Sequence, residues 1–133
     1  MKDLVTDFLK QKKIAVIGSF RNKEKFAYRI LVDLMKKGYE VFPVNPSLSE
    51  VQGRVCYKTI GDIPDSVDAV NLVTPPSVTE SILKECLQKG VKRVWLQPGA
   101  ESSVAIQFCH DNGIKVIHSI CVMMNSLKNE ERL

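Results

Sequence analysis

The chain has 133 residues, with a hydrophobic fraction of 44%, a charged fraction of 26% and a formal net charge of +4. This balance is typical of a globular domain and excludes intrinsically disordered and fibrous proteins. A chain of this length buries about two-thirds of the surface that its unfolded form exposes, so we predict one domain over residues 1–133.

The sequence carries no signal for a membrane, a metal or a nucleic acid. Its longest apolar runs span a few residues, whereas a membrane-spanning helix needs roughly 20. The opening segment contains Asp3 and Asp7 and lacks an apolar signal region, so a cytoplasmic location is expected. Four cysteines without CxxC spacing and two histidines predict no metal site, and an aromatic fraction of 7% offers no stacking surface for nucleic acid.

Short β-rich runs alternate with longer helical patterns along the chain. An amphipathic helix is expected at residues 2–11, and the tail 122–133 is a further helical candidate. Strands are expected at residues 14–17, 40–44, 68–73, 93–97 and 114–118, with a short one near 55–57. Helices are expected at residues 25–37, 77–89 and 101–112. Such βαβ units predict an α/β fold, a Rossmann-like doubly wound parallel sheet of about five strands with helices on both faces.

Two of these helices are expected to bury an apolar stripe of 3.6-residue period. In the first helix, the stripe consists of Phe26, Ile30, Leu31, Leu34 and Met35. In the second helix, it consists of Val78, Ile82, Leu83, Cys86 and Leu87. The spacing of Ser77 and Glu80 predicts a capping box at the start of the second helix. Pro43 predicts that strand 40–44 lies at an edge of the sheet or is irregular.

A basic turn follows the first strand, at the edge of the sheet where ligands of such folds bind. Gly18 permits a close backbone approach, and the basic turn after it consists of Arg21, Lys23, Lys25 and Arg29. Cations near a helix N-terminus oppose the helix dipole, which favours an anion site here over a solvated basic face.

The same turn departs from the dinucleotide fingerprint. The pattern GxGxxG would need glycines where Phe20 and Lys23 stand, and the second strand ends at Asn45-Pro46 with no carboxylate for a ribose. A phosphate-bearing nucleotide other than NAD is therefore favoured, while the fold class leaves an NAD(P)-binding oxidoreductase or sensor as the alternative.

The loops after the third and fourth strands supply further candidate groups. Thr74-Pro75-Pro76 forms a rigid apolar wall, although Pro76 alone could simply begin a helix. Gln97-Pro98 offers an amide at the next strand end, and Trp95 is expected in the core.

Together these segments resemble the family of small CoA-binding domain proteins, which are related to the CoA-binding domain of the succinyl-CoA synthetase α subunit. The matching segments lie between residues 12 and 122, at 16–19 (VIGS), 28–29 (YR), 38–46 (GYEVFPVNP), 55–57 (VCY), 62–64 (DIP) and 94–99 (VWLQPG). Near the end of the fifth strand Cys121 also matches, whereas Ile120 stands where relatives often have arginine.

The resemblance implies that coenzyme A or an acyl-CoA lies across the carboxyl edge of the sheet. The pyrophosphate region would be held by Gly18, Ser19, Phe20, Arg21, Asn22 and Lys23. Asn45 and Pro46 would border the adenosine end. The adenine or pantetheine would meet Val73, Thr74, Pro75 and Pro76, and the remaining edge would consist of Leu96, Gln97 and Pro98. On charge alone, Arg21, Lys23 and Arg29 are candidates for the 3′-phosphate.

Cys121 has two interpretations. It falls near the edge of the expected pocket, where its thiol could form a mixed disulfide with CoA. The competing interpretation, which we favour, is a buried structural cysteine.

No catalytic constellation is visible in the sequence. There are no paired carboxylates in one loop, no nucleophile elbow and no base beside a candidate nucleophile, so we favour a CoA-binding module without catalysis of its own. Besides the NAD(P) interpretation, a second alternative is a non-catalytic subunit that docks on an acyl-CoA enzyme. A protein partner or a homo-oligomer is thus a candidate. Pro43 and the apolar residues 122–124 are candidate contact surfaces.

Overall fold

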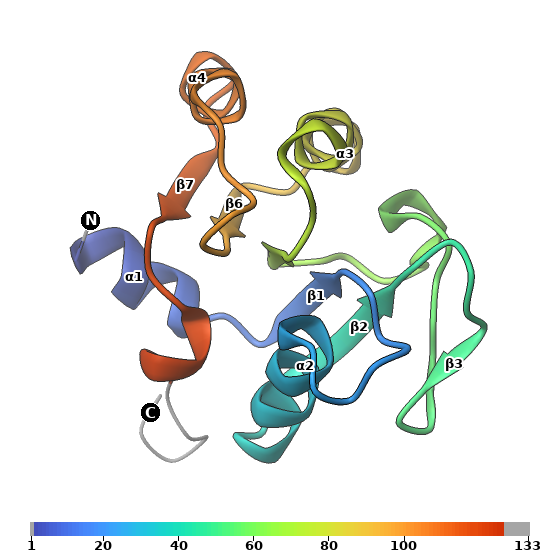
Figure 1. Cartoon of the computed structure of the whole chain (residues 1–133). Coiled ribbons are helices and arrows are strands. Elements are labelled where there is room, and N and C mark those ends of the chain that lie inside the picture. The colour runs from blue at the N-terminus through green and yellow to red at the C-terminus, as the bar shows by residue number, and fades with distance from the viewer. Residues whose placement is uncertain (1, 127–133) are drawn as a thin grey trace.

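The structure is a computed structural model and describes residues 2–126 (Figure 1). The α-helices are α1 (Lys2–Leu9), α2 (Phe26–Lys36), α3 (Pro76–Lys89) and α4 (Ser103–Asp111), and the 3-10 helices are η1 (Ile60–Asp62) and η2 (Val122–Met124). The strands are β1 (Lys13–Ile17), β2 (Glu40–Val44), β3 (Glu50–Val51), β4 (Arg54–Val55), β5 (Ala69–Leu72), β6 (Arg93–Leu96) and β7 (Lys115–His118).

The main sheet has five parallel strands in the order β2-β1-β5-β6-β7. From β1 the chain steps through α2 to one side, and from β5 it steps through α3 and α4 to the other side. Right-handed crossovers in opposite directions place their helices on opposite faces, so α2 covers one face while α3 and α4 cover the other (Figure 1). The predicted fold class is confirmed, and the strand order reverses between β1 and β5.

Both faces of the sheet are buried. Alternate residues of β1 divide between the two cores: Ala15 and Ile17 lie on the face of α3 and α4, and Ile14 and Val16 lie on the face of α1 and α2. Trp95 has no exposed surface, as predicted, and its indole N–H donates to the Ile120 carbonyl oxygen at 2.8 Å. Since the strands are covered on both sides, their sequences are continuous apolar runs.

The predicted edge position of Pro43 is also confirmed, because β2 is the outermost strand of the main sheet on its side. Proline cannot donate a hydrogen bond, but the Pro43 carbonyl accepts one from the Tyr57 N–H at 3.0 Å. An isolated parallel bridge joins Val44 to Tyr57, so the chain after the small β3–β4 hairpin runs back beside β2.

The predicted helix faces are wrong at three positions. Phe26, Val78 and Leu87 are 58%, 42% and 39% exposed, respectively. The smaller side chains of Ala27 and Thr79 are buried instead, because short side chains let α2 and α3 lie close to the sheet. The buried stripe is therefore displaced toward small and polar positions that hydrophobicity alone does not identify.

The predicted capping box is wrong as well. Helix α3 begins at Pro76 with Pro75 as its N-cap residue and no side-chain cap, while Glu80 accepts a hydrogen bond from the Ser102 hydroxyl at 2.7 Å. Pro76 has no N–H to satisfy, and the N–H groups of Val78 and Thr79 donate to the Pro75 carbonyl oxygen at 3.0 Å, so a side-chain cap is not needed.

The predicted helical tail is reduced to the single turn of η2 among the described residues, and residues 127–133 lie outside them. Of the predicted contact surface, the side chains of Pro43 and Val122 are buried, whereas Met123 is half-buried and Met124 is 86% exposed. None of the described helices combines the length and the hydropathy that crossing a bilayer requires.

Candidate functional site

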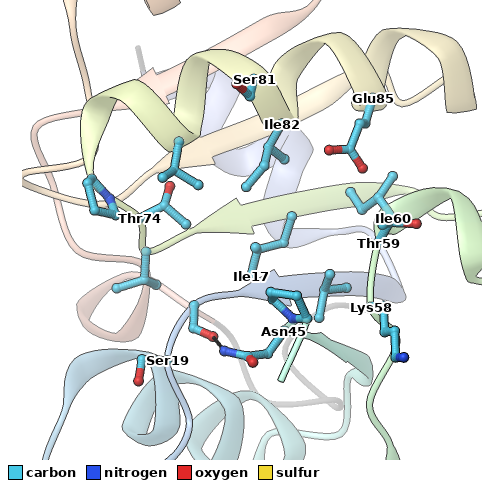
Figure 2. A pocket seen from close by; sticks show the side chains of 16 residues that line it. Ile17, Ser19, Asn45, Lys58, Thr59, Ile60, Thr74, Ser81, Ile82 and Glu85 are labelled. Atoms are coloured by element: carbon cyan, nitrogen blue, oxygen red, sulfur yellow. Dashed lines mark hydrogen bonds between the residues drawn. The ribbon is translucent and has the colours of Figure 1, made fainter. Parts of the chain in front are cut away.

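A pocket of about 470 Å³ opens at the carboxyl ends of β1, β2 and β5, with α3 along one side (Figure 2). This is the point at which the strand order reverses, where open parallel sheets bind their ligands. The lining residues are Ile17, Gly18, Ser19, Val44, Asn45, Pro46, Lys58, Thr59, Ile60, Val73, Thr74, Pro75, Val78, Ser81, Ile82 and Glu85.

Apolar side chains make up the interior of the pocket, and polar groups lie around it. Ile17, Ile60 and Ile82 come from the strand end, η1 and α3 and surround the same space (Figure 2). Lys58 and Glu85 are the charged residues among those described that line it. An apolar space with a few polar groups suits a ligand with a flat or flexible apolar part and charged ends.

Gly18 makes the floor of the pocket possible by its lack of a side chain. A Cβ atom at this position would lie 2.6 Å from the Ala27 Cβ and 3.0 Å from the Val73 carbonyl oxygen. The backbone after β1 therefore lies directly between α2 and the end of β5, and any larger residue would push them apart.

Asn45 ties the ends of β1 and β2 together. Its side-chain amide donates to the Gly18 carbonyl oxygen at 2.7 Å, and its side-chain oxygen accepts from the Ser47 N–H at 2.8 Å. Its own N–H donates to the Tyr57 carbonyl oxygen at 2.9 Å. Asn45 thus lines the pocket as predicted, and its polar atoms already hold the loops in place.

The turn after β5 is fixed by two threonine hydroxyls. The hydroxyl oxygens of Thr74 and Thr79 lie 2.6 Å apart, and the Thr79 hydroxyl donates to the Pro75 carbonyl oxygen at 3.2 Å. Burial of Thr79 beneath the first turn of α3 thereby orients Thr74 and Pro75, which line the pocket.

The backbone amides after Gly18 are available to a ligand. The N–H groups of residues 19–23 donate no hydrogen bond to any residue between 2 and 126. Asn22 organises the end of this loop, since its side-chain oxygen accepts from the Glu24 N–H at 2.9 Å and its carbonyl accepts from the Lys25 N–H at 3.0 Å. Successive unpaired N–H groups favour an anion.

The predicted site residues divide into three groups. The structure brings Gly18, Ser19, Asn45, Pro46, Val73, Thr74 and Pro75 together around the pocket. It places Arg21, Asn22, Lys23, Arg29, Pro76 and Pro98 on the exposed surface outside the pocket lining. Within the basic turn, the Arg29 guanidinium lies over the Phe26 ring, 5.6 Å from its centroid.

The remaining predicted residues are buried or hydrogen-bonded. The side chains of Phe20 and Leu96 are 4% and 0% exposed and belong to the core. The Gln97 amide donates to the Cys121 sulfur at 3.3 Å, and its oxygen accepts from the Val122 N–H at 2.9 Å and from Asn71 at 3.2 Å. Cys121 is half-buried beside Gln97 and does not line the pocket.

Several lining residues were not predicted from the sequence. They are Ile17, Val44, Lys58, Thr59, Ile60, Val78, Ser81, Ile82 and Glu85. On α3 the helical spacing of Val78, Ser81, Ile82 and Glu85 was a usable signal, because these positions share one face. The short strand expected near 55–57 did not indicate that Lys58 reaches the pocket, because a single bridge at Tyr57 holds that segment beside β2.

The described residues indicate no metal site, and the buried cysteines of the core are not reactive. The described residues contain no cluster of three metal-ligating side chains. Burial raises the pKa of the Cys56 and Cys86 thiols, and it raises the pKa of Cys109 to about 11. These three cysteines are therefore protonated at neutral pH and act as apolar core residues.

Comparisons with known proteins identify the family of the chain. The family model described as "CoA binding domain" matches residues 12–126. The α subunit of an ADP-forming acetate–CoA ligase II from Pyrococcus furiosus is 32% identical over 134 aligned positions, covering 92% of this chain and 29% of the relative. The uncharacterized protein YneT of Bacillus subtilis is 26% identical over 113 positions, covering 85% of this chain and 84% of YneT.

Solved structures show that the chain shares its fold with known proteins. A conserved hypothetical protein from Pyrococcus furiosus has a TM-score of 0.83 at 38% identity, with 87% of this chain and 100% of that chain covered. The dinucleotide-forming acetyl-coenzyme A synthetase 1 of Ca. Korarchaeum cryptofilum has a TM-score of 0.73 at 25% identity, with 84% and 27% covered. The chain spans only 12% to 29% of the length of the ADP-forming acetate–CoA ligases that it matches.

Proposed function

The chain belongs to the CoA binding domain family, and from this membership we propose that it binds coenzyme A or an acyl-CoA in the pocket between β1, β2, β5 and α3. The unit that binds is proposed to be one domain and to work in the cytosol. No step of catalysis is assigned to it.

The observation that carries the proposal is the combination of an apolar pocket with unpaired backbone amides at its border. The amides of residues 19–23 offer N–H groups to a diphosphate, and the exposed basic turn beside them adds positive charge. The space enclosed by Ile17, Ile60 and Ile82 suits the adenine ring or the pantetheine chain.

The same edge is poorly suited to NAD. A nicotinamide dinucleotide on this fold needs an acceptor for its ribose hydroxyls at the end of the second strand. Here that position is Asn45, which offers a neutral amide instead of a carboxylate and whose side-chain oxygen also accepts the Ser47 N–H. The diphosphate could still bind, but the ribose would lose its main contact.

Calorimetric titration of reduced, ligand-free protein with CoA and with NAD tests the proposal. We expect saturable binding of CoA to one site and NAD binding that is weaker by at least about tenfold, because loss of a charged hydrogen bond costs about that much. Tighter binding of NAD than of CoA would instead support the oxidoreductase or sensor alternative.

A second candidate function is docking on a partner that carries the catalytic chemistry. It is favoured by the match to an acetate–CoA ligase α subunit of which this chain covers 29%. Immobilised protein, loaded with CoA, should then retain an acyl-CoA enzyme from the cytosol of its own cell. Retention of no such enzyme, with or without CoA, would count against docking and would leave CoA binding as the proposed function.

A further inference from the structure

Lys58 is a pocket cation without a structural role. Its side chain is exposed, it lines the pocket, and its ammonium makes no ion pair or hydrogen bond with any residue of the described chain. Other lysines are held by the protein: Lys13 pairs with Asp65, Lys37 with Asp33 and Lys115 with Asp7.

The backbone at Lys58 is nevertheless fixed. The preceding residue, Tyr57, forms the bridge to Val44, donates its N–H to Pro43 and accepts the N–H of Asn45. Two residues further on, Ile60 is 1% exposed. These two anchors fix where the Lys58 side chain begins at the rim of the pocket, while the side chain itself stays exposed.

Anion-binding groups therefore lie at two separate places on the pocket. Figure 2 shows Ser19, which begins the run of unpaired amides, and Lys58 at opposite ends of the space. Glu85 lies on α3, across the pocket from Lys58, and is not ion-paired with it. A phosphate at this end is consequently attracted to the β2 side and repelled by the α3 side.

The adenosine of CoA carries negative charge at two places, as the two anion-binding places of the pocket require. It has a diphosphate on the 5′ oxygen and a single phosphate on the 3′ oxygen of the same ribose. If residues 19–23 bind the diphosphate, the second phosphate needs a cation elsewhere. The basic turn is not available inside the pocket, because Arg21, Lys23 and Arg29 lie outside its lining.

We propose that Lys58 binds the 3′-phosphate of CoA and makes this site select CoA over dephospho-CoA. The inference rests on the proposed function. It assigns recognition of the 3′-phosphate to Lys58, which the bridge between β2 and Tyr57 brings to the pocket, and no longer to the basic turn, as the sequence had suggested. The basic turn is left to act on the diphosphate, which CoA and dephospho-CoA share.

The test is calorimetric titration of the wild type, Lys58→Met, Lys58→Arg and Lys23→Met with CoA and dephospho-CoA. We expect Lys58→Met to weaken CoA binding about tenfold, as for loss of a charged hydrogen bond, and to leave dephospho-CoA binding unchanged. Lys58→Arg should retain the preference for CoA, since it keeps the charge. Lys23→Met should affect both ligands by the same factor.

Lys84→Met is the matched control, because Lys84 is an exposed lysine on α3 outside the pocket lining. Equal weakening of both ligands by Lys58→Met, or a selective loss of CoA in Lys23→Met alone, would overturn the inference while CoA binding stands. A wild type that binds neither ligand would overturn the proposed function itself, and the role of Lys58 with it.

Discussion

The amino and carboxyl ends of the parallel strands form opposite edges of the sheet, and their charged groups are satisfied to different degrees. At the amino edge, the Asp7 carboxylate lies 2.6 Å from the Arg93 guanidinium and 3.5 Å from the Lys115 ammonium. Nearby, Asp68 accepts the Lys13 N–H at 3.0 Å. The ion pairs of Asp7 therefore join α1 to the first residues of β6 and β7.

At the carboxyl edge several polar groups have no partner among the described residues. The amides of residues 19–23 and the side chains of Lys58 and Glu85 make no hydrogen bond or ion pair within the part of the chain that the structure describes. The side chains that are paired there, such as Asn45, hold the loops around the space. This difference is what we expect if the proposed ligand binds at the carboxyl edge, where open parallel sheets bind their ligands.

Thiol reactivity should sharpen this comparison most strongly. Burial raises the pKa of the Cys109 thiol to about 11, which lowers its thiolate fraction at pH 8 by a factor on the order of 100 relative to an ordinary cysteine. We therefore expect iodoacetamide to label Cys121 at the carboxyl edge at least about 100-fold faster than Cys109. Peptide mass spectrometry of a labelling time course measures both rates, and Cys121→Ser should abolish the fast phase. Equal rates for the two thiols would contradict the burial of Cys109.

A single methyl group at Gly18 should damage the carboxyl edge. Gly18→Ala places a Cβ atom 2.6 Å from that of Ala27, so we expect the free energy of unfolding to fall by about 1–3 kcal/mol. Gly61→Ala is the control, since a Cβ atom there meets only the Thr59 hydroxyl oxygen at 3.7 Å. Urea denaturation compares the two variants, and equal stabilities would show that the approach of the chain to Ala27 is not tight.

The amino edge should contribute stability with a defined pH dependence. The hydrogen bond from Arg93 lowers the pKa of Asp7 below its ordinary value of 3.8, so the unfolded chain binds this proton more readily than the folded one. Stability from Asp7 is then complete above that ordinary value and is lost as the pH falls through the lower, folded pKa.

Asp7→Asn should accordingly cost about 1 kcal/mol of unfolding free energy at pH 7, and the difference from the wild type should shrink below about pH 4. Glu40→Gln is the control, because Glu40 is exposed at the same edge and has no ion pair with a described residue. Denaturation at several pH values measures both, and an Asp7→Asn difference that persists unchanged at pH 2 would contradict the ion pair.

The strands, their order of appearance and the family were predictable because each rests on local sequence. Apolar runs such as that ending at Gly18 define the sheet, and the family match confirms the resemblance read from segments such as 38–46 and 94–99. The turn residues that follow the strands, Ser19 and Thr74 among them, were predicted for the same reason, since strand ends fix where they lie.

What sequence patterns missed depends on contacts between distant segments. Lys58 reaches the pocket through one bridge between Val44 and Tyr57, a pairing too short to leave a periodic pattern. The basic turn was assigned to the pocket because of its charge. The charge of a side chain does not determine which way it points, and the side chains of this turn lie outside the pocket lining. Gln97 was expected to offer its amide, which the structure instead pairs with Cys121.

The most direct test of the central claim is CoA binding by a variant in which the pocket is filled. Val78 lines the pocket and is 42% exposed, so Val78→Trp should be tolerated by α3 while its ring occupies the space. Val104, at 62% exposure in the first turn of α4, lies outside that pocket, which makes Val104→Trp the matched control. Calorimetry should show that the control binds CoA like the wild type and that Val78→Trp binds at least about tenfold more weakly, as for loss of about 1.4 kcal/mol. Wild-type affinity in both variants would show that CoA does not bind between β1, β2, β5 and α3.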